Sequence, residues 1–137
     1  MCKMLLSINP EHVENILSGR KQFEYRKARC RETVDSIVIY STAPQMRIVA
    51  EVEIDDIIVG NILEVWNLTK QYAGISYQFY RRYYKGKKTA VAYKLGAIME
   101  FCEPLLLSDL GLAHPPQSFA YLDKLPELEV KRYGNQL

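Results

Sequence analysis

The sequence has little net charge and few cysteines. It contains 18 Lys and Arg residues against 16 Asp and Glu residues, so the net charge is only +2. That balance argues against a protein that binds nucleic acid strongly and without specificity. The three cysteines are widely spaced and contain no C-x-x-C pair, which excludes a complete disulfide framework. With only two histidines beside them and no zinc-like spacing, we expect no metal site and no cofactor.

Long apolar runs are also absent. No stretch approaches the roughly 18 apolar residues that a membrane span requires. The apolar residues near the N-terminus stop at Asn9 and Pro10, too early for the core of a signal peptide. We therefore expect no membrane partner and a location in a reducing cytoplasm. A chain of 137 residues, 48% hydrophobic and 25% charged, is typical of one folded domain, which we expect to span 1–137.

Local signals predict an α+β domain. Asn9 and Pro10 are typical of a helix start and Gly19 of a helix end, which predicts a helix over 10–18. Two further helices are predicted over 63–71 and 76–85, and a short one near 117–122. Alternating or β-branched residues predict strands over 3–8, 22–27, 36–40, 48–54 and 89–101, the last with a bend at Gly96. This order favours helices that flank a mainly antiparallel sheet or small barrel.

The segment after Gly19 is the most informative. It passes directly from a helix into a strand that carries Lys21, Glu24 and Arg26. Glu24 and Arg26 are two residues apart and leave the same face of the strand, whereas Phe23 and Tyr25 point to the core. Two cations with a carboxylate between them can hold a phosphate or the edge of a base. The competing interpretation is a surface ladder of ion pairs without a function.

The spacing Gly-x-Lys-x-x-Glu-x-Arg resembles the hallmark of the ASCH domain family, whose members are related to the PUA-like RNA-binding domains. The resemblance extends over 5–10, over the turn at 40–44 and over 48–54. The run Pro115-Pro116-Gln117-Ser118-Phe119 is similar to the tail of a bacterial and archaeal branch often described as predicted transcriptional regulators.

The resemblance implies a small, mostly antiparallel β-barrel with helices packed around it. It also implies a cleft beside the strand of Lys21, Glu24 and Arg26 that binds a nucleic acid or a nucleotide. Ser41 and Thr42, whose hydroxyl groups lie on a turn at the end of a strand, are further candidates for this site.

A second candidate region contains no acidic residue. The stretch 65–99 has seven Lys and Arg residues and seven Tyr and Phe residues but no Asp or Glu. Cations neutralise phosphates and aromatic rings stack on unpaired bases, so this mixture suits single-stranded RNA. Tyr77, Tyr80 and Tyr84 are also spaced like the core face of a helix, and we expect the tyrosines to be core residues. The predicted cationic edge consists of Arg81, Arg82, Lys85, Lys87 and Lys88.

Two function classes remain open at this point. In the first, the chain binds RNA or a nucleotide-like ligand without catalysis and acts in transcription or translation control. In the second, it is a hydrolase that acts on RNA, as a metal-independent ribonuclease, or on a modified nucleoside. The ribonuclease would use Glu24 as base, with Lys21 and Arg26 stabilising the phosphorane; neither histidine lies in the motif.

The sequence argues against one further alternative. A bacterial branch of small amidohydrolases in the same family uses the motif lysine, a threonine three positions later and a glutamate in the later helical region. In this chain Glu24 replaces the threonine, so the hydroxyl nucleophile is missing, and 65–99 offers no glutamate.

Overall fold

The first three elements follow the local signals of the sequence. The computed structural model describes residues 2–31, 33–117, 119–123 and 125–134, so Ser118 of the proline-containing run lies outside the described residues. Strand β1 (Cys2–Ile8) leads into helix α1 (Pro10–Leu17). The side chain of Asn9 accepts a hydrogen bond from the Glu11 N–H and caps the helix. Strand β2 (Phe23–Arg26) follows after Gly19, whose φ of 86° ends the helical segment.

A seven-stranded sheet forms the body of the molecule. Its hydrogen-bonded order is β2-β5-β4-β3-β1-β6, and β7 also pairs with β5. The pairing of β1 with β3 is parallel and every other described pairing is antiparallel, which confirms the predicted mainly antiparallel α+β fold. The path ends at β2 on one side and β6 on the other, so the sheet does not close into a complete barrel. The other strands are β3 (Val34–Ser41), β4 (Arg47–Asn61), β5 (Thr89–Leu105), β6 (Phe119–Leu122) and β7 (Val130–Gly134).

Strands β4 and β5 are longer than the sequence predicts. The prediction ended the first of them at 54, before Asp55 and Asp56, but β4 continues to Asn61 because β5 pairs with it over its whole second half. The register shifts near Ile54, opposite the segment that contains Gly96, where we predicted a bend. A Cβ on Gly96 would overlap the Asp55 carboxylate, so the absent side chain leaves room for the acidic group.

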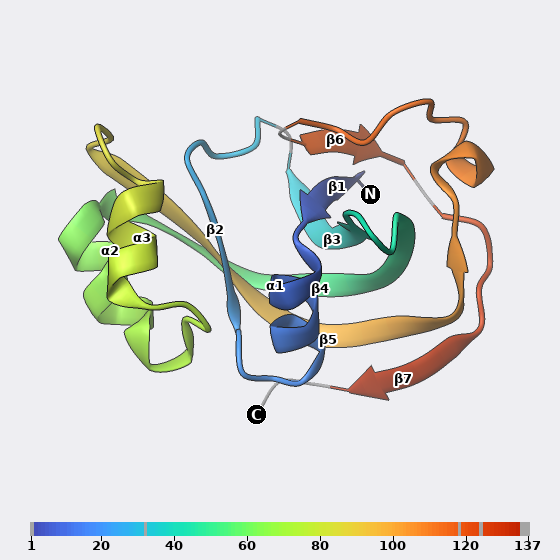
Figure 1. The fold of residues 1–137 in the computed structure, drawn as a ribbon, viewed down its shortest axis with the longest axis horizontal. Coiled ribbons are helices and arrows are strands. Elements are labelled where there is room, and N and C mark those ends of the chain that lie inside the picture. Colours follow the sequence, from blue (N-terminus) through green and yellow to red (C-terminus); the bar gives the residue numbers. More distant parts are fainter. Residues whose placement is uncertain (1, 32, 118, 124, 135–137) are drawn as a thin grey trace.

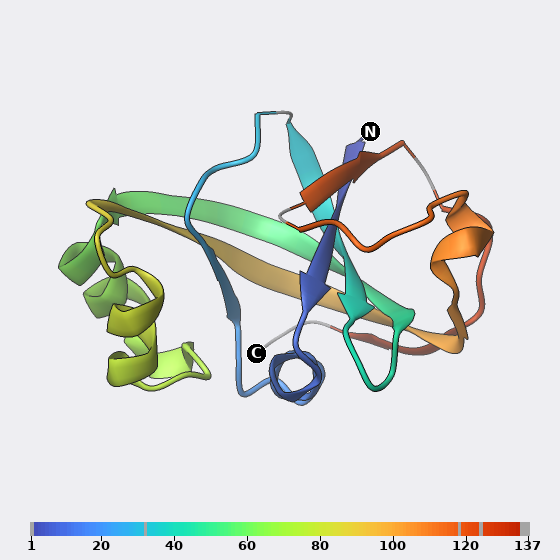
Figure 2. The same cartoon turned by 45° about the horizontal axis from the view of Figure 1, so that its top comes forward.

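The helical lobe packs on the far end of this β4–β5 ribbon. It consists of α2 (Ile62–Thr69), a 3-10 turn (Lys70–Tyr72) and α3 (Tyr77–Tyr83). Both views show the two helices together at one end of the ribbon and the C-terminal segments at the other (Figure 1, Figure 2). Tyr80 and Tyr84 are buried, as predicted, whereas Tyr77 is 39% exposed.

The C-terminal region differs from the prediction. We predicted a short helix near 117–122, but Phe119–Leu122 forms β6, which pairs antiparallel with β1. The local sequence has no strong strand signal there, and the open edge of β1 supplies the backbone partners that make it a strand. None of the helices in the described part of the chain is long and apolar enough to cross a membrane.

Two apolar clusters flank the region of interest. One contains the inner faces of β1, α1, β3, β4 and β5, with Leu6, Ile16 and Tyr93 among its buried side chains. The other joins β2 to the helical lobe and contains Phe23, Tyr25 and Tyr80. The sequence motif of β2 therefore lies where the sheet body meets the helical lobe.

Candidate functional site

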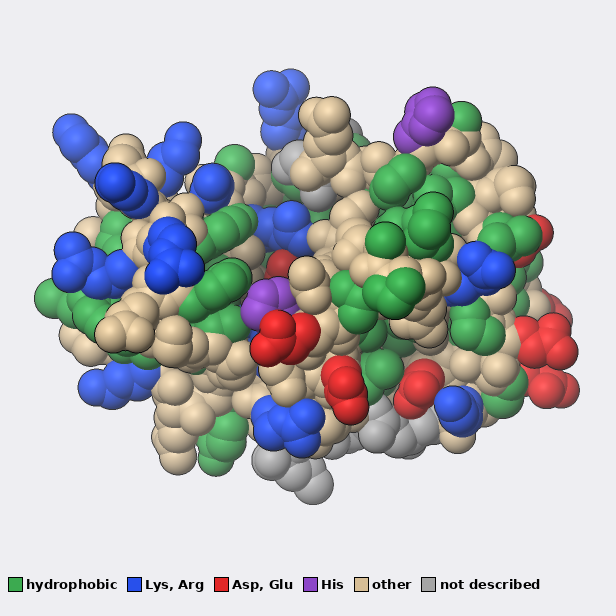
Figure 3. Space-filling view, viewed as in Figure 1, with side chains coloured by type: hydrophobic (Ala, Val, Ile, Leu, Met, Phe, Trp, Pro, Cys, Tyr) green, Lys and Arg blue, Asp and Glu red, His purple; other side chains and the backbone are tan. Residues whose placement is uncertain are grey.

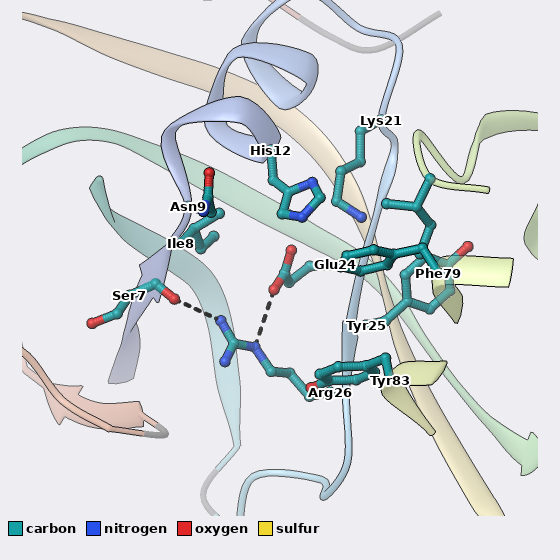
Figure 4. A pocket seen from close by; sticks show the side chains of 11 residues that line it. Ser7, Ile8, Asn9, His12, Lys21, Glu24, Tyr25, Arg26, Phe79 and Tyr83 are labelled. Atoms are coloured by element: carbon teal, nitrogen blue, oxygen red, sulfur yellow. Dashed lines mark hydrogen bonds and ion pairs between the residues drawn. The ribbon is translucent and has the colours of Figure 1, made fainter. Parts of the chain in front are cut away.

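A pocket of about 160 Å³ opens between the sheet body and the helical lobe. Four elements contribute to it: the end of β1, the first turn of α1, strand β2 together with Lys21 shortly before it, and α3 with the loop that precedes it (Figure 4). Its walls are formed by Ser7, Ile8, Asn9, His12, Lys21, Glu24, Tyr25, Arg26, Ile75, Phe79 and Tyr83. The three motif side chains that the sequence singled out thus share one pocket.

Lys21 is buried at the inner end of the pocket, with 3% of its surface exposed. Its backbone N–H donates to the Asn15 carbonyl at 2.9 Å, which ties the start of β2 to the end of α1. Its Nζ donates to the Ala73 carbonyl at 3.3 Å and lies 4.7 Å from the centre of the Tyr25 ring. Lysine is seldom buried this deeply, and a buried lysine that lines a pocket is a candidate for a binding or catalytic role.

The surroundings of Lys21 change its acidity. Burial lowers the pKa of Lys21 below its ordinary value of 10.5. The nearby Glu24 carboxylate raises this pKa and the Arg26 guanidinium lowers it, without reversing the effect of burial. The ammonium group of Lys21 therefore gives up its proton more readily than a lysine in water.

The side chains of Glu24 and Arg26 connect β2 to β1. Arg26 Nε lies 3.1 Å from Glu24 Oε2, an ion pair that lacks the alignment of a hydrogen bond. Arg26 Nη2 donates to the Ser7 carbonyl at 3.1 Å, so the guanidinium bridges two strands that do not pair through their backbones (Figure 4). Glu24 is 7% exposed. This burial contradicts the alternative of a solvated ion-pair ladder on the surface.

His12 is the side chain that the sequence analysis left out of the site. It projects from the first turn of α1 into the pocket, and its imidazole faces Lys21 and Glu24 (Figure 4). The ring meets Phe79 edge to face at 5.4 Å between ring centres. Burial lowers the pKa of His12 below 6.5; Lys21 lowers it further, and Glu24 and Glu11 act in the opposite direction. At neutral pH the imidazole is therefore uncharged.

Aromatic side chains form the wall on the side of the helical lobe. Phe79 is 41% exposed at the pocket, and Tyr83 lies half-buried beside it. Lys27 Nζ lies 4.8 Å from the centre of the Tyr83 ring, which places a further cation next to this wall. An exposed phenylalanine at the edge of a charged pocket offers a surface on which a planar ligand can stack.

The predicted cationic edge lies outside the pocket, on α3 and the turn that joins it to β5. All five of its residues are exposed: Arg81, Arg82, Lys85, Lys87 and Lys88. The space-filling view shows Lys and Arg side chains gathered over α3 and this turn, on the face where the hollow opens (Figure 3). The cationic edge is far from the motif in sequence but lies on the same face of the molecule as the opening of the pocket.

Ser41 and Thr42 do not line the pocket. Ser41 is fully buried at the end of β3, and Thr42 donates its backbone N–H to the Ile8 carbonyl at 3.0 Å. This hydrogen bond ties Thr42 to the end of β1, which borders the pocket. Among the residues that the structure describes, no three His, Cys, Asp or Glu side chains converge in a way that could hold a metal ion.

The arrangement combines four functional groups in one small volume. A buried ammonium, a guanidinium and a carboxylate can bind a phosphate or the polar edge of a base. The uncharged imidazole adds a group that can accept a proton near neutral pH. The aromatic wall supplies the apolar surface that such ligand pockets usually contain.

Comparison with curated proteins identifies several relatives, among them a ribonuclease and a ribosomal protein. An ASCH domain-containing ribonuclease of Zymomonas mobilis subsp. mobilis is 29% identical over 125 residues, which cover 88% of this chain and 84% of the relative. A large ribosomal subunit protein uL22 of Ureaplasma parvum serovar 3 is 24% identical over 120 residues and 87% of this chain. The chain spans only 39% of the length of this ribosomal protein.

Comparison with solved structures and with family models gives a consistent result. The crystal structure of ASCH from Zymomonas mobilis superposes with a TM-score of 0.81 at 28% identity, over 89% of this chain and 88% of that chain. A crystal structure of a serine-to-alanine mutant of the same protein also gives a TM-score of 0.81. The model of the ASCH domain matches residues 6–99, which include the end of β1, all of α1 and β2, and the helical lobe. The chain therefore belongs to the ASCH domain family.

Proposed function

We propose that the chain binds single-stranded RNA or a nucleotide-like ligand in the pocket of Lys21, Glu24 and Arg26, and that it acts in transcription or translation control. The observation that carries this proposal is the burial of two opposite charges, Lys21 and Glu24, in a pocket that is open to ligands. Buried charges are costly to a fold, and a binding site is a common reason for keeping them. Membership of the ASCH family supports a role that involves RNA.

The chemistry of the pocket matches a nucleotide. Lys21 and Arg26 supply positive charge for a phosphate or for the acceptor atoms of a base, and Glu24 accepts from an amino group. Phe79 offers an exposed ring on which a base can stack. Phe79 and Tyr83 of α3 form one wall of this pocket, whose volume of about 160 Å³ suits a single unpaired base and not a base pair. Single-stranded RNA therefore fits better than a duplex.

The first test of this proposal compares two aromatic residues of α3. Replacing Phe79 by alanine is expected to weaken binding of a short single-stranded RNA roughly 5- to 150-fold, the effect of losing one base stack of about 1–3 kcal/mol. Tyr77 is exposed to a similar degree but lies outside the pocket, against Trp66. Tyr77→Ala is therefore the matched control. Fluorescence anisotropy measures both affinities, and equal losses for the two variants would contradict the assignment of Phe79.

The cationic edge makes a separate prediction about salt dependence. Combined replacement of Lys85, Lys87 and Lys88 by glutamine is expected to flatten the plot of log affinity against log salt concentration. For a single strand the slope changes by about 0.7 for each phosphate contact that is lost. Arg47→Gln, an exposed cation at the opposite end of β4, should leave the slope unchanged. An unchanged slope in the triple variant would show that these lysines do not contact phosphates.

A second candidate function is metal-independent cleavage of RNA. The relative named as an ASCH domain-containing ribonuclease favours it, because 84% of that protein aligns with this chain. The pocket also supports it, because Lys21, Arg26 and Glu24 lie together with a histidine that can transfer protons. Binding and cleavage use the same pocket, so the first proposal holds whether or not cleavage follows.

A further inference from the structure

The contacts of His12 with other described residues do not account for its place in the pocket. Its Nδ1 is buried and has no hydrogen-bond partner in the described part of the chain. The ring is held by its edge-to-face contact with Phe79, and the imidazole lies in the pocket facing Lys21 and Glu24 (Figure 4). A histidine that served only to stabilise α1 would be expected to use its polar atoms in hydrogen bonds to the protein.

We infer that His12 is the general base of RNA cleavage in this pocket, accepting the proton of a ribose 2′-hydroxyl. The inference rests on the ribonuclease function proposed above as the second candidate. It assigns a catalytic role to a residue outside the Gly-x-Lys-x-x-Glu-x-Arg motif.

His12 is better suited to this role than Glu24. The Glu24 carboxylate is held by Arg26 at 3.1 Å, so an incoming hydroxyl group would have to compete with this ion pair for Oε2. The imidazole of His12 has no such partner among the described residues, and it is uncharged at neutral pH because burial and Lys21 lower its pKa. Glu24 instead provides nearby negative charge that favours the imidazolium after it forms.

The reaction balances with groups that line the pocket. In the tautomer that carries its proton on Nδ1, His12 Nε2 takes the proton of the 2′-hydroxyl as O2′ attacks the adjacent phosphorus. The bond between phosphorus and O5′ breaks, and O5′ takes a proton from the Lys21 ammonium group, whose lowered pKa favours this transfer. Arg26 provides positive charge for the phosphorane. The products are a 2′,3′-cyclic phosphate and a 5′-hydroxyl end, and proton exchange with water restores both side chains.

The charges around His12 determine the expected pH dependence. Glu11 on α1 and Glu24 on β2 favour the protonated form of His12, and the positive charge of Lys21 disfavours it. The other side chains of the pocket that carry or could carry a charge are Arg26, which is positive, and Tyr25 and Tyr83, which are uncharged at neutral pH. Because the pKa of His12 is lowered, the rate should fall on acidification only below pH 6.5. The rate should also fall at alkaline pH, because Lys21 loses its proton there, at a pH below 10.5. The profile of kcat/KM is therefore expected to be bell-shaped.

The test compares the two histidines of the chain. Cleavage of a single-stranded RNA oligonucleotide is measured with chelator present from pH 4 to pH 10, roughly the range in which His12 and Lys21 titrate. The proteins compared are the parent, His12→Asn, His12→Gln and His114→Asn. His114 is exposed outside the pocket and is the matched control. Loss of a general base is expected to lower kcat/KM about 10²- to 10⁴-fold and to remove the acidic limb of the profile. His114→Asn should behave like the parent.

A binding measurement separates this inference from the proposed functions. The same oligonucleotide with 2′-O-methyl groups cannot be cleaved, and both His12 variants should bind it about as tightly as the parent. If the His12 variants cleave RNA at the parental rate, the inference is wrong and the ribonuclease function stands. If the parent binds but releases no 2′,3′-cyclic phosphate, the inference and the ribonuclease function both fail. If the parent does not bind the oligonucleotide either, the proposal of RNA binding fails as well.

Discussion

Replacing Lys21 by methionine is expected to weaken RNA binding roughly 30-fold or more, because removal of one buried, hydrogen-bonded charge at an interface costs about 2–5 kcal/mol. Methionine preserves most of the length of the side chain, which packs against Gly74 and under the Tyr25 ring. The variant no longer buries an ammonium group. We therefore expect its melting temperature to equal or exceed that of the parent.

The pH dependence of stability provides an independent check on the same variant. The pKa of Lys21 is lowered in the folded chain, so below 10.5 the unfolded chain binds its proton more tightly than the folded one. Stability of the parent should therefore rise with pH through the window between the lowered pKa and 10.5. Lys21→Met should lack this rise.

Lys94→Met is the control for Lys21→Met. Lys94 is an exposed lysine of β5, the strand that pairs with β2, and lies outside the pocket. The Lys94→Met variant should bind RNA as tightly as the parent and should show the same rise in stability at alkaline pH. A Lys21→Met variant that binds RNA like the parent would remove Lys21 from the site.

The second large effect is expected at Gly74, the residue that makes room for Lys21. Its φ is +69°, and a Cβ there would overlap Lys21 Cβ and lie 2.8 Å from Lys21 Cα. A left-handed conformation costs about 1–2 kcal/mol for an L-residue, and forcing extra volume into packed atoms costs about 1–3 kcal/mol. Gly74→Ala is therefore expected to lower the free energy of unfolding by roughly 2–5 kcal/mol and to weaken RNA binding through displacement of Lys21.

Gly86→Ala isolates the effect of backbone conformation. Gly86 has a φ of +80°, but no atom lies within 4 Å of the position that an alanine Cβ would take, so only the conformational cost of about 1–2 kcal/mol applies. Urea unfolding followed by circular dichroism measures both variants. Equal losses of stability would show that the contact between Gly74 and Lys21 is unimportant.

Local chemistry explains why much of the fold was predictable. Helix α1 begins and ends within one residue of its predicted bounds because its cap at Asn9, Pro10 and the terminating Gly19 all lie in one short segment. The alternation in β2 correctly placed Phe23 and Tyr25 in the core. The motif spacing was specific enough to predict the ASCH family, which the match over residues 6–99 confirms.

Long-range contacts explain the differences. Whether 119–122 becomes a helix or a strand depends on the open edge of β1, more than 100 residues earlier in the chain. The extension of β4 past Asp55 depends likewise on its pairing with β5. Such pairings carry no signal within the segment itself, and tertiary contacts override weak local preferences.

The sequence by itself determined the family, the α+β class and the motif residues Lys21, Glu24 and Arg26, because each depends on residues that are close together in the chain. Only the tertiary structure decided that Lys21 and Glu24 are buried, and that His12 and Phe79 share a pocket with them. His12 and Phe79 are 67 residues apart, and they meet because α1 and the helical lobe both lie next to β2 and line the same pocket (Figure 1). Periodicity and capping predict which face of an element is apolar, but not which elements face each other across a gap in the sheet.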